Sequence, residues 1–352
     1  MKTGLLQLSS IGTALLLLAG MTDAGVQSVA FVEQKTWRFE YDNDFFFDKD
    51  DKISSGLSLQ WHAAVAESWD GLRGVPCIFK RIGSAIPTLT KEDLSFRFGM
   101  GVGQVIQTPS DLERRDLIEE DVPYAGVLAL QLNWYAFSDR EYRGFGALAG
   151  VVGPPSLAEQ AQAVGHKLTD NTNPRGWDNQ LSTEPVLNCS YMRKKKFWSG
   201  GDPAALAYDA TIGGDADLGN LLTQVGATLE MRMGHNMPKG FASVSDPISI
   251  GTHHVAVLAP SSPNRASVYA FLVLGGNAYA HNMFLDGNTF QESHSVEKET
   301  LVAKALGGIH YDRGRWGIQC SVYVTTDNVD TSKATAARGN ERIGTIIVEW
   351  RF

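Results

Sequence analysis

The sequence has few cysteines, no excess of positive charge and, after its first thirty residues, no long apolar run. The three cysteines Cys77, Cys189 and Cys320 are odd in number, and their spacing matches no zinc or redox motif. We therefore expect the cysteines to be small packing residues that form no disulfide. The net charge of -8 and the lack of a basic stripe argue against a nucleic-acid partner.

The strongly apolar stretch lies close to the N-terminus. Lys2 precedes GTALLLLAG, a run that suits the apolar core of a signal peptide but is too short for a membrane-spanning helix of about 20 residues. Small residues ending at Ala24 and Ala30 offer two cleavage points, of which we favour Ala30. We therefore predict a signal peptide over residues 1–30 and a mature domain over residues 31–352.

In the rest of the chain, many segments alternate between apolar and polar residues. In RIGTIIVEWRF at the C-terminus, Val348, Trp350 and Phe352 fall on one face, and Glu349 and Arg351 fall on the other. A period of two indicates a strand. The same pattern predicts twelve strands, at about 36–45, 53–64, 93–105, 123–137, 143–153, 183–196, 203–214, 222–234, 265–280, 299–311, 314–325 and 341–352.

Two architectures fit alternating strands. A soluble sandwich or barrel points its apolar face inward, whereas a membrane barrel points it outward at lipid and keeps a polar interior. Strands near ten residues match a tilted bilayer crossing, and a final aromatic residue is typical of outer-membrane barrels. The polar faces carry charges suited to a salt-bridged lumen: Arg38, Glu40, Arg97, Glu230, Arg232, Glu349 and Arg351. We therefore predict an all-β fold, a transmembrane antiparallel β-barrel of about 12 strands.

An even number of strands places both termini on the periplasmic side. Two connections there, 65–92 and 235–264, are long although periplasmic turns are short in such barrels. Either they are ordered inserts or the strand count is locally wrong. The loops expected at the opposite, extracellular side are 46–52, 107–122, 154–182, 215–221, 281–298 and 326–340.

The stretch EYDNDFFFDKDD mixes acids, an amide and phenylalanines where the first strand ends. Asp44 offers the hard oxygen ligand that calcium selects. Asn43, and Ser54 at the start of the second strand, offer hydrogen-bond donors to an oxyanion. A solvated loop explains the acids of residues 48–51 equally well, and their spacing is not that of an EF-hand.

One extracellular loop is expected to hold a short helix. In VVGPPSLAEQAQAVGHKL, Ser156 and Glu159 have the spacing of a capping box. Glu159, Gln162 and His166 then share one helix face. A surface or hydrogen-bonded histidine is the commoner role, but His166 at this rim is a candidate base because histidine titrates near neutrality. Together with the carboxylate of Asp44, the amide of Asn43 and the hydroxyl of Ser54, a basic His166 would provide the functional groups needed for metal-assisted ester hydrolysis.

Seven motifs, in order, resemble those of the outer-membrane lipid A 3'-O-deacylases. They are NDFF at 43–46, SSGLSLQW at 54–61, GQVIQTPSDL at 103–112, DVPYAGVLAL at 121–130, GVVGPPSLAEQAQAVGHKL at 150–168, GWDNQLSTEP at 176–185 and GNLLTQVGATLEMRMG at 219–234. The resemblance implies a twelve-stranded barrel in the bacterial outer membrane. It also implies calcium-dependent hydrolysis of the 3'-linked acyloxyacyl ester of lipid A in the outer leaflet, with a histidine and a bound water.

The resemblance assigns roles residue by residue. His166 matches the catalytic histidine, Asn43 and Asp44 match an Asn-Asp pair, and Ser54 stands where the family usually has threonine. Val122 replaces the arginine of the family's Asp-Arg-Pro-Tyr-Ala-Gly motif.

Four further residues are candidates for substrate binding. Phe45 follows the Asn-Asp pair and would seat an acyl chain. Trp177, Gln180 and Glu184 lie in the matching GWDNQLSTEP motif, where packing of a loop against a strand explains the same residues equally well.

Two rival functions are compatible with the same barrel. An outer-membrane phospholipase would need a nucleophilic serine close to a histidine, and no His-x-Ser pair stands beside a matching asparagine in this sequence. A passive porin-like barrel would need an open lumen, which the inward charges of twelve strands would fill.

Overall fold

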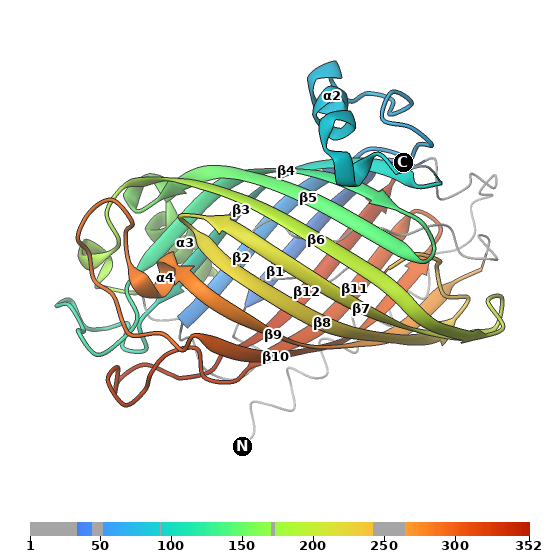
Figure 1. Ribbon diagram of the computed structural model, residues 1–352. Helices are drawn as coiled ribbons and strands as arrows, with labels where there is room; N and C mark the ends of the chain where they lie inside the picture. The colour runs from blue at the N-terminus through green and yellow to red at the C-terminus, as the bar shows by residue number, and fades with distance from the viewer. Residues whose placement is uncertain (1–33, 44–51, 92, 170–172, 242–264) are drawn as a thin grey trace.

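The computed structural model describes residues 34–43, 52–91, 93–169, 173–241 and 265–352, and there twelve strands close into one barrel (Figure 1). Each strand pairs antiparallel with the next, and β1 closes the barrel by pairing with β12. The strands are β1 (Thr36–Asn43), β2 (Lys52–His62), β3 (Ser95–Thr108), β4 (Ala125–Phe137), β5 (Glu141–Val152), β6 (Glu184–Gly201), β7 (Leu206–Gly219), β8 (Leu222–His235), β9 (Ser267–Asn282), β10 (Leu301–Arg313), β11 (Trp316–Thr325) and β12 (Arg342–Arg351). All twelve predicted strands are confirmed.

The barrel has two different ends. Both Thr36 and Arg351 lie at one, which we call the terminal end, and Asn43 lies at the other, the loop end. The loop end carries the helices α3 (Ala158–Thr169) and α4 (Met283–Asp286) (Figure 1). Within the described residues, no helix has the length and apolar character needed to cross a membrane.

The apolar face of the wall points outward. On β1, Trp37, Phe39 and Tyr41 are exposed, while the alternate residues Arg38 and Glu40 are fully buried inside the barrel. This arrangement is the reverse of a soluble barrel and is the one expected for strands that face lipid. The predicted transmembrane barrel is therefore confirmed.

Ion pairs fill the lumen. Near the terminal end, Arg38 pairs with Glu40 at 3.2 Å and with Glu349 at 3.5 Å, and Arg351 pairs with Glu349 at 2.6 Å and with Asp312. A second set joins Lys194 to Glu230, and both Lys196 and Arg232 to Asp209. Buried charges are costly unless paired, so these inward charges neutralise one another across neighbouring strands.

The first long connection is an ordered insert, so the strand count was right. It contains α2 (Cys77–Ala85) and η3 (Pro87–Leu89), and α2 stands outside the barrel near the C-terminus (Figure 1). The ring of Phe79 stacks on Phe98 of β3 at 5.0 Å, and the Trp134 indole of β4 donates a hydrogen bond to the Phe79 carbonyl at 2.8 Å. Most of the second connection lies outside the described residues.

The predicted loop at 215–221 was wrong. Strand β7 continues to Gly219, and residues 220–221 make the turn into β8. Asp217 faces the lumen, where its carboxylate accepts a hydrogen bond from Gln224 at 2.6 Å. The glycines and aspartates of this segment suggested a turn, but a lumen-facing strand accepts both residue types.

The three cysteines are free thiols, which agrees with the absence of a disulfide role. Their expected packing role was wrong, because all three are exposed. Cys189 and Cys320 lie on the outer face of β6 and β11, and Cys77 opens α2. A period-two pattern predicts which face a side chain occupies but not what covers that face.

Candidate active site

The loop after β5 folds back onto the outer wall of the barrel. Its helix α3 and the preceding η4 (Pro154–Ser156) lie over β3 and β4. Gly126 of β4 permits this close approach, since a Cβ there would lie 2.1 Å from the Cβ of Ala158. The outward-facing Gln104 side chain of β3 donates a hydrogen bond to the Ser156 carbonyl at 2.6 Å. The helix therefore lies against the lipid-facing side of the wall.

The predicted capping box was wrong. The helix begins at Ala158, after Leu157, whose φ of 59° is left-handed. Ser156 belongs to η4, and its buried hydroxyl has no hydrogen-bond partner among the described residues. Glu159 is exposed. The left-handed residue changes the chain direction, so the helix starts one residue later than a Ser156 cap requires.

His166 lies on the buried face of α3. That face consists of Ala158, Gln162 and His166, spaced four residues apart, and the last two are 5% and 7% exposed. The Trp177 indole donates a hydrogen bond to Oε1 of Gln162 at 3.0 Å, and its ring lies 5.0 Å from the ring of Tyr124. Since Gln162 lies one turn before His166, Trp177 holds the helix face that carries the histidine against the wall.

Asn43 and Ser54 lie on adjacent strands at the loop end. Asn43 is the last residue of β1 and continues the outward-facing set that contains Tyr41. In β2 the pairing with β3 shifts between residues 53 and 55, so Ser54 is the extra residue of a β-bulge. Bulges change the direction of the chain locally and are common beside active sites.

The bulge adjoins the seam between α3 and the wall. Ser55 pairs with Ile106 of β3, and Ile106 packs with Ala158 and Trp177. Ser54 therefore lies on the strand next to the one that supports the His166 helix, and Asn43 lies one strand further around the barrel. Asp44 and Phe45 follow Asn43 directly in the chain and lie outside the described residues, so their roles stay predictions.

Gln180 and Glu184 hold loops in place. The Gln180 side chain donates a hydrogen bond to the Trp177 carbonyl at 3.0 Å. Glu184 is 2% exposed, and its carboxylate accepts hydrogen bonds from the amides of Thr289 and Phe290 at 3.0 and 3.1 Å. The contacts of Glu184 are those expected for packing of a loop against a strand, the alternative to substrate binding.

Val122, where the resemblance predicts an arginine, fills an apolar core between loops. It is fully buried and clusters with Leu285 of α4, Val296 and Val329. At position 122 the loops of the loop end therefore pack through apolar contacts, whereas the resemblance predicts a charged arginine there.

An ion pair beside this core involves Asp286. Its carboxylate accepts hydrogen bonds from Lys298 at 2.7 Å and from the Asn282 amide at 2.8 Å. Burial alone would raise the pKa of Asp286, but hydrogen bonds from His281, Lys298 and the Asn282 amide lower it to about 2. Because the folded pKa is depressed, this contribution to stability is fully present above the unfolded pKa of about 3.9 and is lost as the pH falls towards 2.

Among the described residues, one group of three side chains could hold a cation. Ligand atoms of His310, Asp312 and Glu349 lie within 4.8 Å of one another. The group lies in the lumen near the terminal end, and Arg351 pairs with both carboxylates. The negative charge is thus already neutralised, and the group belongs to the lumen network.

Sequence reasoning missed Gln104, whose hydrogen bond positions the loop that carries α3. Gln104 interrupts the outward-facing apolar set of β3, which contains Met100, Val102 and Ile106. A polar side chain on a lipid-facing set is a detectable signal that something covers it. Gln162 was placed on the correct helix face, but its partner Trp177 could not be identified from spacing.

The chain matches one protein family over nearly its whole length, and its fold matches a solved structure of that family. A family model described as "Outer membrane protein LpxR" matches residues 11–352. The solved structure of LpxR from Salmonella typhimurium is 13% identical and covers 90% of this chain and 100% of that chain, with a TM-score of 0.71. The β domain of the Bordetella autotransporter Brka is 9% identical over 90% of this chain and 97% of that chain, and its TM-score of 0.39 is too low to guide interpretation. No curated protein matches the chain.

Proposed function

Because the chain belongs to the family of outer membrane protein LpxR, we propose that it is an outer-membrane lipid A deacylase that hydrolyses the 3'-linked acyloxyacyl ester. The observation that carries this proposal is the place of His166. The histidine lies on the buried face of α3, the helix that packs on the outer wall over β3 and β4, and β3 pairs with the strand that carries Ser54. An ester of an outer-leaflet lipid would reach this seam without leaving the membrane.

The proposed reaction is attack by an activated water. His166 accepts a proton from the water as its oxygen bonds to the ester carbonyl carbon. Asn43 and Ser54 donate hydrogen bonds to the oxyanion that develops on the carbonyl oxygen. The tetrahedral intermediate then releases the sugar-linked alkoxide, which takes the proton from His166. The products are a free acyloxyacyl acid and a lipid A hydroxyl.

The donor set suits a calcium ion. The carboxylate of Asp44 and the amide oxygen of Asn43 are hard oxygen ligands adjacent in the chain. A bound calcium would supply Lewis-acid polarisation of the ester carbonyl. The chain's own part is to supply the oxygen ligands of Asn43 and Asp44 and to keep His166 on α3.

The outer faces of β1 and β2 form an apolar surface against which acyl chains would pack. On β1, Phe39 and Tyr41 point outward and are 43% and 37% exposed, and on β2, Leu57 and Leu59 are each 45% exposed. Tyr41 pairs with Leu57 and Phe39 with Leu59. Phe45, two residues beyond the end of β1, would extend this apolar surface to the ester.

Mass spectrometry of membrane lipids tests the proposal. Cells that express the chain should contain lipid A shortened by one acyloxyacyl group, with phospholipids intact. A phospholipase would instead produce lysophospholipid and leave lipid A unchanged. Unchanged lipid A, both in cells and with the purified protein, would refute the deacylase.

Planar bilayers test the porin-like alternative. We expect no steady ion current from the purified barrel, because paired charges such as Arg38 with Glu40 and Arg232 with Asp209 fill the lumen. A stable conductance of porin size would show that the lumen is open. Lipid A hydrolysis by the same preparation would establish that the silent protein is folded.

Replacing the Trp177 indole should slow the reaction moderately. Trp177→Phe keeps an aromatic ring but removes the donor to Gln162, whose net contribution is about 0.5–1.5 kcal/mol. If the whole free energy of this hydrogen bond serves to position His166, its loss lowers kcat by up to roughly tenfold. Trp316→Phe is the matched control, because Trp316 is exposed on the outer face at the terminal end. Equal kcat values for the two variants would remove Trp177 from the positioning role.

A further inference from the structure

The outer wall of β5 and β6 carries charged side chains at the terminal end of the barrel. Glu141 and Arg143 of β5 point outward, because they alternate with Tyr142, which is fully buried in the lumen. The neighbouring strand β6 places Arg193 opposite Arg143. It also places Lys195 opposite Glu141, so all four charged side chains share one patch of the outer wall.

The insert between β2 and β3 adds a further cation to this patch. The Lys91 ammonium lies 2.7 Å from the Glu141 carboxylate. The same carboxylate accepts hydrogen bonds from Arg143 at 2.7 Å and from Arg193 at 3.0 Å. We call Lys91, Arg143, Arg193 and Lys195 the basic cluster. One carboxylate therefore faces four cations, and the positive charges of the patch exceed the negative one by three.

The basic cluster lies on a surface that faces lipid. Towards the loop end, the next outward pair on β5 and β6 is Phe145 with Tyr191, and Leu187 further along β6 is 64% exposed. Towards the terminal end, the exposed Trp198 lies against Tyr208, with their ring centroids 4.8 Å apart. Tryptophan and tyrosine collect at membrane–water interfaces. The cluster therefore lies between the apolar wall and an interfacial aromatic pair, at the level of lipid headgroups.

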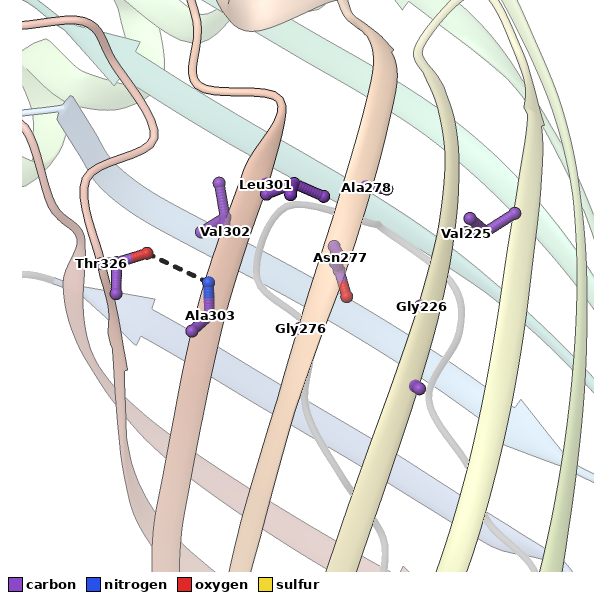
Figure 2. Close-up of a pocket in the computed structure, with 10 residues that line it drawn as sticks. Val225, Gly226, Gly276, Asn277, Ala278, Leu301, Val302, Ala303 and Thr326 are labelled. Atoms are coloured by element: carbon purple, nitrogen blue, oxygen red, sulfur yellow. Dashed lines mark hydrogen bonds between the residues drawn. The ribbon is translucent and has the colours of Figure 1, made fainter.

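Such charge is a local feature of the outer wall. The open groove over β8, β9 and β10, for example, is lined by no charged side chain (Figure 2). Charges on the lipid face of a barrel destabilise it, least so near the interfaces. The Arg193 and Lys91 side chains are 59% and 55% exposed, so they can reach an anion of the membrane. Guanidinium groups match phosphate with paired hydrogen bonds, which makes a lipid phosphate the anion that fits.

We propose that the basic cluster binds the phosphate of an anionic glycerophospholipid, whose acyl chains lie along Phe145 and Tyr191. In outer-membrane barrels the short turns face the periplasm, and residues 138–140 are the short turn from β4 to β5. The cluster therefore meets the inner leaflet, which glycerophospholipids form, and not the outer leaflet of lipid A. Its excess positive charge favours a lipid with net negative charge over phosphatidylethanolamine, whose ammonium group it repels.

This lipid is distinct from the proposed substrate. The loop that carries α3 and His166 follows the opposite end of β5. The inference goes beyond the proposed hydrolysis and depends only on the orientation of the barrel in the membrane.

Native mass spectrometry of the purified barrel, with phosphatidylglycerol or phosphatidylethanolamine added, tests the proposal. The wild-type protein should bind phosphatidylglycerol more tightly. The double variant Arg193→Gln, Lys195→Gln should bind it about 25-fold more weakly, because each cation near a membrane surface contributes roughly fivefold. The matched control is Arg313→Gln, Arg315→Gln, which removes the same charge from exposed positions around the β10–β11 turn at the same end. It should bind phosphatidylglycerol as the wild-type protein does.

Three results would overturn the proposal. The first is equal affinity for phosphatidylglycerol in the two double variants, and the second is equal affinity of the wild-type protein for the two phospholipids. The third is displacement of bound phosphatidylglycerol by an equal concentration of lipid A, which would refute a glycerophospholipid as the occupant.

Lys91→Gln gives a second measurement if the Arg193→Gln, Lys195→Gln protein fails to fold, as judged by heat-dependent migration in SDS gels. Lys91 belongs to the insert and not to the wall, and its side chain is 55% exposed, so the barrel should form without it. Binding of phosphatidylglycerol should weaken roughly fivefold. Unchanged affinity in this variant would also overturn the proposal.

Discussion

The His166→Ala protein should fold and insert but lose nearly all lipid A hydrolysis. Loss of a general base typically lowers a rate by ~10²–10⁴-fold. The helix that carries His166 lies outside the barrel wall, and Ala158 and Gln162 would still anchor it, so barrel formation should be unaffected. The measurement is acyl release from lipid A by purified protein in detergent, followed by mass spectrometry.

Val164→Ala is the matched control for this experiment. Val164 is 61% exposed on the same helix, so its truncation tests whether any change in α3 lowers the rate. It should retain wild-type turnover, and both variants should keep the heat-dependent migration in SDS of a folded barrel. Near wild-type turnover by His166→Ala would remove the histidine from the mechanism.

The strands could be predicted because a barrel wall repeats one simple rule. Trp37, Phe39 and Tyr41 face lipid and Arg38 and Glu40 face the lumen, as a period of two requires. The rule fails where residues are small or polar on both faces. The segment GGDADLG contains little apolar signal, so the last third of β7 was mistaken for a loop.

The site was harder to predict than the wall. Motifs placed Asn43, Ser54 and His166 at one end of the barrel, but no spacing shows which side of the wall a loop helix occupies. That choice depends on contacts between distant segments, such as Gly126 against Ala158 and Gln104 against the Ser156 carbonyl. The role of Glu184 was hidden for the same reason, because its partners Thr289 and Phe290 lie more than a hundred residues away.

Asp44→Asn should abolish most of the activity together with its dependence on calcium. A carboxylate is a far better ligand than an amide oxygen for a hard divalent cation, and a site with few protein ligands depends on each one. Asparagine is close in size to aspartate, so the end of β1 should keep its shape and the barrel should still resist unfolding in SDS. The wild-type protein should lose activity in chelator and recover it when calcium is added back.

Asp48→Asn separates a metal ligand from a solvated acidic loop. It removes the same charge four residues further along the acidic stretch, so general electrostatics would affect both variants alike. If Asp44 is a ligand, Asp48→Asn should keep the wild-type rate and the wild-type response to chelator, while Asp44→Asn should lose both. Full wild-type activity in excess chelator would show that the reaction needs no calcium, and the carboxylate of Asp44 would then serve another purpose, such as ordering the strand end for Asn43.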